Sequence, residues 1–223
     1  MSLEENIKLV KDNMVQASIK SSLSQCVNLV AVTKTVPSET AKKLVDLGIN
    51  HLAENRPEKL IEKQEALKDQ SGITWHLIGT LQTRKIKDVI NRIDYFHALD
   101  RIKTAQEIQN RATKEIKCFV QVNVSGELTK QGILLEDVEG FINELAFYPS
   151  IKVVGLMTMA PYGESVDKIR AYFSKLAKQQ QQLASLKLKH APCTELSMGM
   201  SNDYSIAIEE GATFIRVGSR LFE

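Results

Sequence analysis

The sequence predicts an α/β protein that folds as a single (β/α)8 TIM barrel with a leading N-terminal helix. Short apolar segments, partly β-branched, alternate with longer amphipathic segments along the chain. This alternation is typical of right-handed βαβ units, and eight such units favour a closed barrel. The length of 223 residues fits one barrel, and no linker divides residues 1–223, so we expect one domain.

The first elements follow from the spacing of apolar residues. Residues 3–23 carry apolar side chains at a nearly helical period with a charged opposite face, which predicts the leading helix. Residues 27–32 are almost wholly apolar, as expected of a strand that is covered on both faces. Residues 38–47 then have the pattern of a helix.

The same alternation continues to the end of the chain. We expect further strands at 49–53, 73–78, 94–98, 117–124, 151–157, 193–197 and 212–217, and helices at 57–69, 82–92, 101–113, 136–147, 164–187 and 202–210. Gly48 and Gly72 are predicted to cap the helices before them. Because the chain ends soon after the eighth strand, the leading helix is expected to cover the barrel in place of a final helix. An open doubly wound sheet is the alternative, but no G-x-G-x-x-G follows the first strand.

Composition argues against several functional classes. The net charge is only +2, so no global field favours nucleic acid or an anionic membrane. The short basic run at 84–87 lacks interleaved aromatic residues for stacking on bases. No signal segment or membrane-spanning apolar run is found, so a cytoplasmic location is expected. The three cysteines and four histidines show no metal-ligand spacing, and we expect reduced thiols and no metal site.

In a barrel, the loops that follow the strands form the active mouth. Lys34 follows the first predicted strand, and Asn55 follows the second. A lysine that leaves a buried strand is either solvated or available as a nucleophile.

The loops after strands seven and eight carry serines and glycines, a pattern that suits phosphate. Ser197, Gly199 and Ser201 precede a predicted helix, and Gly218 and Ser219 follow the last strand. Glycine lets backbone N–H groups approach a phosphate, and barrels often bind phosphate at these two loops. Alternatively, the glycines only form turns and Ser201 only caps a helix.

An amine that faces a phosphate site across one mouth suggests a phosphorylated aldehyde held as a Schiff base. Pyridoxal 5′-phosphate (PLP) fits this description. If Arg216, near the end of the eighth strand, meets the pyridine nitrogen, that nitrogen stays unprotonated and the ring is a weaker electron sink. A salt bridge at the strand end is the other reading of Arg216.

Several blocks of the chain together resemble one family. They are Ala31-Val-Thr-Lys34, Leu52-Ala-Glu-Asn55, Trp75-His-Leu-Ile-Gly79-Thr-Leu-Gln82, Gly155-Leu-Met157, Ser197-Met-Gly-Met-Ser201-Asn-Asp203 and Arg216-Val-Gly-Ser219. Their order and spacing resemble the pyridoxal phosphate homeostasis protein family.

The resemblance implies a barrel like the amino-terminal domain of bacterial alanine racemases, with the cofactor on Lys34. It implies a protein that binds PLP and serves in vitamin B6 and amino-acid homeostasis without established turnover. It also implies a monomer that supplies PLP-accepting enzymes. The cofactor-binding residues it implies are Lys34, Asn55, Ser197, Met198, Ser201, Arg216, Gly218 and Ser219.

The alternative is a single-domain PLP-dependent racemase or a related enzyme. Two-sided proton chemistry needs an acid or base on each face of the ring. In the alanine racemases the second base is a tyrosine of another domain, before which this chain stops, and Met159 stands where those enzymes carry a histidine. The chain also departs from the family pattern at Arg56, Arg84 and Glu223.

Overall fold

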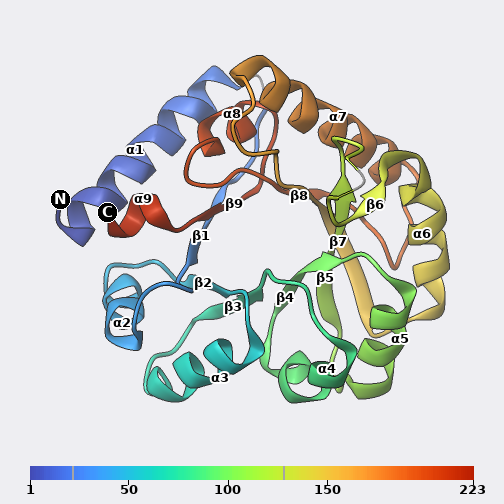
Figure 1. Cartoon of the computed structure of the whole chain (residues 1–223), viewed down its shortest axis with the longest axis horizontal. Helices are drawn as coiled ribbons and strands as arrows, with labels where there is room; N and C mark the ends of the chain where they lie inside the picture. The colour runs from blue at the N-terminus through green and yellow to red at the C-terminus, as the bar shows by residue number, and fades with distance from the viewer. Residues whose placement is uncertain (22, 128) are drawn as a thin grey trace.

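The computed structural model describes residues 1–21, 23–127 and 129–223, and its parallel strands close into a barrel inside a ring of helices (Figure 1). The strand order is β4-β3-β2-β1-β9-β8-β7-β5, and pairing of β4 with β5 closes the ring. The predicted (β/α)8 TIM barrel is confirmed, and the open sheet is excluded.

The elements match the predicted alternation closely. The strands are β1 (Asn28–Val32), β2 (His51–Glu54), β3 (Thr74–Leu77), β4 (Tyr95–Leu99), β5 (Ile116–Asn123), β6 (Ile133–Leu134), β7 (Ile151–Met157), β8 (Glu195–Ser197) and β9 (Phe214–Val217). The helices are α1 (Leu3–Lys20), α2 (Ser38–Asp46), α3 (Pro57–Ala66), α4 (Thr83–Val89), α5 (Ile102–Arg111), α6 (Val138–Glu144), α7 (Val166–Ser185), α8 (Tyr204–Glu209) and α9 (Ser219–Phe222). Short 3-10 turns are η1 (Ile90–Arg92), η2 (Leu135–Asp137) and η3 (Leu145–Phe147).

The first strand lies between the last strand and the second. Ala31 of β1 is in register with Val217 of β9, and Val32 is in register with Ala53 of β2. All these pairs are parallel, so the loops after β9, β1 and β2 leave the barrel side by side. We call the end of the barrel where the strands finish the mouth.

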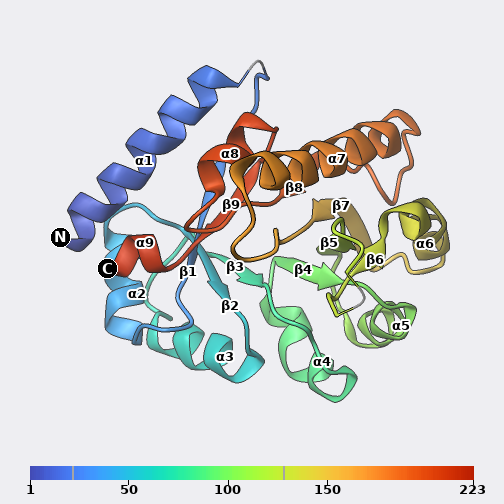
Figure 2. The ribbon, with the colours of Figure 1, turned by 45° about the horizontal axis from the view of Figure 1, so that its top comes forward.

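The leading helix α1 packs beside α8 and α9 on the outside of the barrel, and both chain ends lie close together (Figures 1 and 2). A capping box begins the helix, since the Glu5 amide donates to the Ser2 hydroxyl at 3.2 Å and the Ser2 amide donates to the Glu5 carboxylate. The Asn6 amide group donates to the Leu221 carbonyl at 3.2 Å. The first helix therefore covers the outside of the barrel, as the sequence predicts, but the short helix α9 also follows the last strand and was not expected.

Further details differ from the sequence-based expectation. The helix expected at 136–147 is divided into η2, α6 and η3, and α3 ends at Ala66, so Gly72 does not cap it. The two-residue strand β6 was not expected, because so short a segment carries no period. It pairs with β5 after Gly132, where a Cβ would lie 2.8 Å from the Asn123 nitrogen and the φ of +117° favours glycine.

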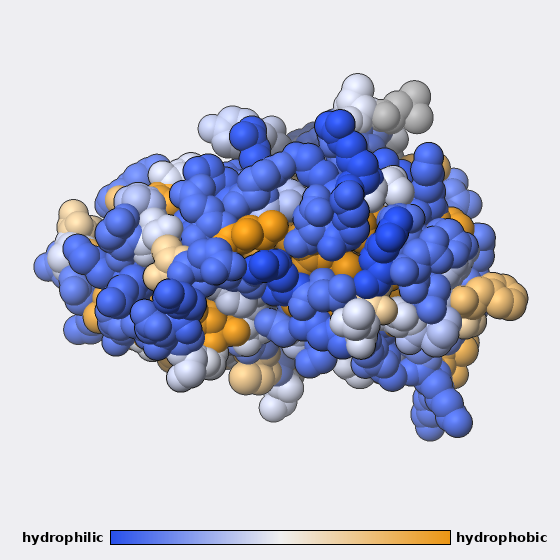
Figure 3. Space-filling model, turned by 90° about the horizontal axis from the view of Figure 1, so that it is seen from below, coloured by the Kyte–Doolittle hydropathy of each residue, from blue (hydrophilic) through white to orange (hydrophobic). Residues whose placement is uncertain are grey.

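In the view of Figure 3, hydrophilic side chains cover most of the face and border a narrow hydrophobic strip. Among the described residues, no helix combines the length and the apolar character needed to cross a bilayer.

Candidate functional site

Lys34 lies at the mouth in a tight turn that directly follows β1. The buried Thr33 donates its amide to the Ala53 carbonyl at 3.0 Å, and its carbonyl accepts from the Val36 amide at 3.1 Å. The Lys34 side chain itself is exposed. The backbone of the turn is therefore fixed, while the amine is free to meet a ligand at the mouth.

A buried ion pair supports this turn from below. Glu54 of β2 accepts from the Thr33 hydroxyl at 2.7 Å, and the Lys63 ammonium bonds both Glu54 and the Thr33 carbonyl. Glu54 and Lys63 are almost completely buried. This pair was not predicted from the sequence, although Lys63 shares an inward face with Leu60 and with Leu67, the C-cap of α3, a spacing that marks it as buried.

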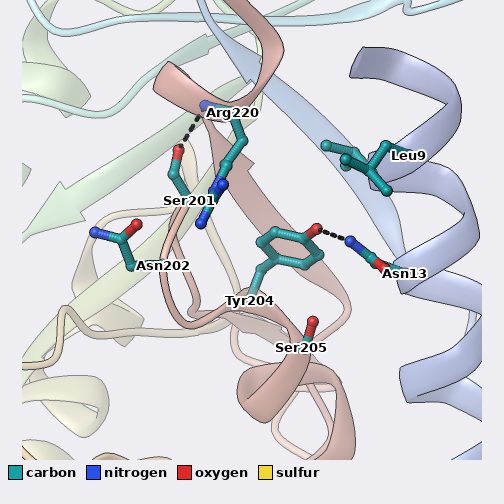
Figure 4. A pocket seen from close by; sticks show the side chains of 8 residues that line it. Leu9, Asn13, Ser201, Asn202, Tyr204, Ser205 and Arg220 are labelled. Atoms are coloured by element: carbon teal, nitrogen blue, oxygen red, sulfur yellow. Dashed lines mark hydrogen bonds between the residues drawn. The ribbon is translucent and has the colours of Figure 1, made fainter. Parts of the chain in front are cut away.

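Ser201 is the acceptor for two backbone N–H groups of the loop after β9. Its hydroxyl oxygen lies 3.2 Å from the Gly218 nitrogen. It also lies 3.5 Å from the Arg220 nitrogen, a contact drawn in Figure 4. Two donors that converge on one oxygen make a concave arrangement that suits an anion oxygen. The loops expected to bind phosphate therefore meet. Ser201 precedes the helix as predicted, but α8 begins at Tyr204 and its N-cap is Asp203, so Ser201 is not the cap.

The segment from Ser197 to Ser201 is held firmly against β9. Met198 is buried and donates its amide to the Phe214 carbonyl at 3.1 Å. The Gly199 carbonyl accepts from the Arg216 amide at 2.9 Å. Gly199 has a φ of +91°, and a Cβ there would lie 2.6 Å from the Ala207 Cβ. Glycine is thus required for this loop to pack on α8.

Arg216 is a buried cation at the mouth. Its guanidinium donates to the Ser197 hydroxyl oxygen at 2.6 Å and to the Thr158 carbonyl at 2.9 Å, at the ends of β8 and β7. Burial lowers the pKa of Arg216 to about 10, while the negative charge of Asp203 acts to raise it. The group therefore stays cationic at neutral pH. Within the described residues, no carboxylate forms an ion pair with it. The salt-bridge reading is not what the structure shows, and the remaining N–H groups suit an acceptor on a ligand.

The other two predicted residues flank this centre. Asn55 is half-buried after β2, and a Cβ on Gly79 would lie 2.2 Å from the Asn55 carbonyl oxygen, so a glycine is needed there. Ser219 is exposed at the start of α9. Both therefore lie at the mouth, next to the loops that follow the neighbouring strands.

A cavity of about 240 Å³ opens beside Ser201 and reaches α1 (Figure 4). Arg220 extends along it near Ser201 and Asn202, and Leu9 forms part of the opposite wall. Asn13 of α1 donates to the Tyr204 hydroxyl at 3.0 Å across its floor. The leading helix therefore contributes to the surroundings of the phosphate-type loops, which the sequence did not predict.

Comparison with known proteins agrees with this geometry. The family model for the alanine racemase N-terminal domain matches residues 4–223. A pyridoxal phosphate homeostasis protein of Aquifex aeolicus is 38% identical over 229 residues, which cover 100% of this chain and 98% of that protein. PipY of Synechococcus elongatus PCC7942, solved with PLP bound, is 29% identical with a TM-score of 0.85, and the match covers 100% of both chains. An alanine racemase of Clostridium difficile 630 shares the fold, with a TM-score of 0.70 and 19% identity over 98% of this chain and 56% of that one.

Proposed function

Since the chain belongs to the pyridoxal phosphate homeostasis protein family, we propose that it binds PLP as a Schiff base on Lys34 and serves in vitamin B6 and amino-acid homeostasis. The PLP-bound structure of PipY supports this proposal. The likeness to alanine racemase concerns the fold, and no feature of the described site favours a racemase.

The observation that carries the proposal is the placement of three groups on adjoining strand ends. Ser201 follows β8, Arg216 belongs to β9 and Lys34 follows β1, and these strands are neighbours in the barrel. An amine, a buried guanidinium and two convergent backbone N–H groups thus surround one mouth.

Each group matches one part of the cofactor. The Gly218 and Arg220 amides, with the Ser201 hydroxyl, would hold the phosphate, because backbone N–H groups in such loops bind anions. Arg216 would donate to the pyridine nitrogen, since a guanidinium can only donate. When bound, the cofactor supplies an aldehyde that reacts with a primary amine, and Lys34 presents that amine. Asn55, Ser197, Met198 and Ser219 would complete the walls of the site.

The proposal extends beyond the binding site in three respects. Residues 1–223 would work as one binding domain, as a monomer in the cytoplasm, and would deliver the cofactor to PLP-accepting enzymes. The homeostasis function in the names of the relatives supports such a carrier role.

A titration tests the binding. Purified protein is mixed with increasing PLP, and the visible absorbance and the free ligand after dialysis are measured. We expect saturation at one PLP per chain for the wild type and for Lys42→Ala, a control at an exposed lysine of α2. Lys34→Ala should lose the new absorbance band. An unchanged band in Lys34→Ala, or no saturable binding by the wild type, contradicts the proposal.

A further inference from the structure

A line of three histidines crosses the interior of the barrel. His51, His76 and His97 belong to the neighbouring strands β2, β3 and β4. His51 Nδ1 lies 2.9 Å from His76 Nε2, and His76 Nδ1 lies 2.9 Å from His97 Nε2. His76 and His97 are fully buried, whereas His51 is partly exposed at the first residue of β2. The line therefore runs from the amino-terminal end of the barrel towards its mouth.

The line ends on the arginine of the proposed PLP site. His97 Nδ1 lies 2.8 Å from the Ser197 hydroxyl oxygen, which also accepts from Arg216 at 2.6 Å. Aromatic rings pack against these polar groups. The ring centroids of His76 and Tyr95 lie 4.7 Å apart, and those of His97 and Phe119 lie 4.5 Å apart. A polar chain inside an aromatic core is stable only if every member has a partner.

Arg216 sets the direction of every hydrogen bond in the chain. A guanidinium only donates, so the Ser197 oxygen must accept from it. Ser197 is completely buried, and His97 Nδ1 is its other side-chain partner among the described residues. Unless the Ser197 hydroxyl donates to His97 Nδ1, its proton is left without a partner, which is costly in a buried position.

The remaining protons follow from this first step. With Nδ1 of His97 accepting, its Nε2–H donates to His76 Nδ1, and the Nε2–H of His76 donates to His51 Nδ1. All three rings are then neutral and protonated on Nε2. Burial lowers the pKa of His76 and His97 well below the ordinary value, which agrees with neutral rings.

We propose that His97, His76 and His51 are positioning residues. They form a relay of hydrogen bonds that all run in one direction, each donor pointing away from Ser197 and towards His51. The relay turns the Ser197 hydroxyl proton away from Arg216 and so fixes the guanidinium at the mouth. If the relay ran in the opposite direction, His97 would donate to the same oxygen as Arg216, and the buried hydroxyl proton of Ser197 would be left without a partner. The consequence for ligand binding rests on the proposed function, whereas the direction of the relay does not.

The first test reads the direction in the protein without any ligand. Nitrogen-15 NMR of labelled histidine distinguishes a protonated Nε2 from a protonated Nδ1. At neutral pH we expect all three relay histidines as neutral Nε2–H forms. His190 lies outside the relay, bonds the Ile142 carbonyl through Nε2 at 3.0 Å, and is the internal reference.

In Ser197→Ala we expect the His97 signals to shift and those of His190 to stay. A wild-type protein with His76 or His97 protonated on Nδ1, or cationic, contradicts the relay.

The second test measures what the relay does for the ligand. His76→Phe removes the middle of the relay but retains a ring beside Tyr95. Tyr95→Phe, the matched control, changes the same aromatic layer outside the relay. We expect His76→Phe to raise the dissociation constant for PLP by about fivefold, the effect of roughly one hydrogen bond, and to shift the visible band of the bound cofactor. Tyr95→Phe should keep both wild-type values.

The outcomes separate the two proposals. A His76→Phe protein with the wild-type dissociation constant and spectrum contradicts the positioning role. Absence of PLP binding by the wild type contradicts the proposed function instead, and the NMR result on ligand-free protein still decides the direction of the relay. If His76→Phe does not fold, the NMR measurement on the wild type still decides whether the relay has the proposed direction.

Discussion

At the scale of single residues, Ser201 joins the two loops that we assign to phosphate. Its hydroxyl is the acceptor for the Gly218 and Arg220 amides. Ser201→Ala removes a hydroxyl that would bond a charged phosphate, a contact worth about 1.5 to 3 kcal/mol. We expect the dissociation constant for PLP to rise about tenfold or more. The exposed Ser185→Ala on α7 is the control, and equal affinity in both variants removes Ser201 from the site.

Arg216 can be tested in the same way, with stability as a second readout. Arg216→Gln keeps an amide donor near Ser197 and Thr158 but removes the positive charge. We expect weaker PLP binding by roughly tenfold, because a charge-assisted hydrogen bond is replaced by a neutral one at best. Titration measures the affinity, and thermal unfolding without ligand measures the stability. A large drop in the unfolding temperature of the ligand-free protein, with unchanged affinity for PLP, would show that Arg216 is structural.

The site residues differ in how well the sequence predicted them. The placement of Lys34, Ser201 and Arg216 at one end of the barrel could be predicted, because strand ends in a barrel converge, and their part in binding PLP stays a prediction from their residue types. The Ser197 contacts with Arg216 and His97 could not, since they join residues 19 and 100 positions apart. Only the recurrence of a histidine in consecutive strands hinted at a line of rings.

At the scale of elements, α3 holds the turn of Lys34 through one buried ion pair. Lys63→Met leaves the Glu54 carboxylate buried without its cation, and one Glu54 oxygen already lacks a hydrogen-bond partner among the described residues. Breaking such a pair typically costs about 3–5 kcal/mol, so we expect a loss of stability of that order. Chemical denaturation measures it.

A second lysine of the same helix is the control. Lys59→Met breaks an exposed pair with Glu62, for which the expected change is at most about 1 kcal/mol. Equal effects of the two substitutions would mean that the buried pair does not stabilise the turn.

The sequence predicted an element well where the element is long enough to repeat its hydrophobic pattern several times. Helices such as α1 and α7 span several turns, so their apolar faces and serine caps define them. β6 has two residues and α9 has four, too few for any period, and their existence depends on contacts with β5 and α1.

At the scale of the whole molecule, the buried histidines make stability depend on pH. Burial lowers the pKa of His76 and His97 well below the ordinary value of 6.5. The unfolded chain therefore binds more protons than the folded protein at acidic pH, and stability falls as the pH drops below about 6.5.

Measuring the free energy of unfolding at several pH values between about 7.5 and about 5 tests this dependence. We expect a slope of about 1.4 kcal/mol per pH unit for each proton taken up on unfolding, and a shallower slope in His76→Phe. A flat profile would mean that both rings are charged or exposed in the folded state.

The closed barrel was predictable from the sequence because the pattern that produces it repeats along the whole chain. Eight apolar segments separated by amphipathic helices leave few ways to bury every strand on both faces. The packing of α1 on the outside of the barrel followed from the same count, since a barrel needs its last strand covered, whereas α9 was not predicted. The contribution of α1 to the cavity at Ser201 depends on side-chain packing between distant segments, so it became visible only in three dimensions.

The central claim is that PLP is held on the amine of Lys34. Reconstituted protein treated with borohydride, digested and analysed by mass spectrometry identifies the modified lysine. We predict one adduct per chain, on the peptide that contains Lys34, because this residue is exposed in the loop after β1, and β1, β9 and β8 are neighbours in the barrel. An adduct found chiefly on another lysine, or none after reconstitution, would contradict the account.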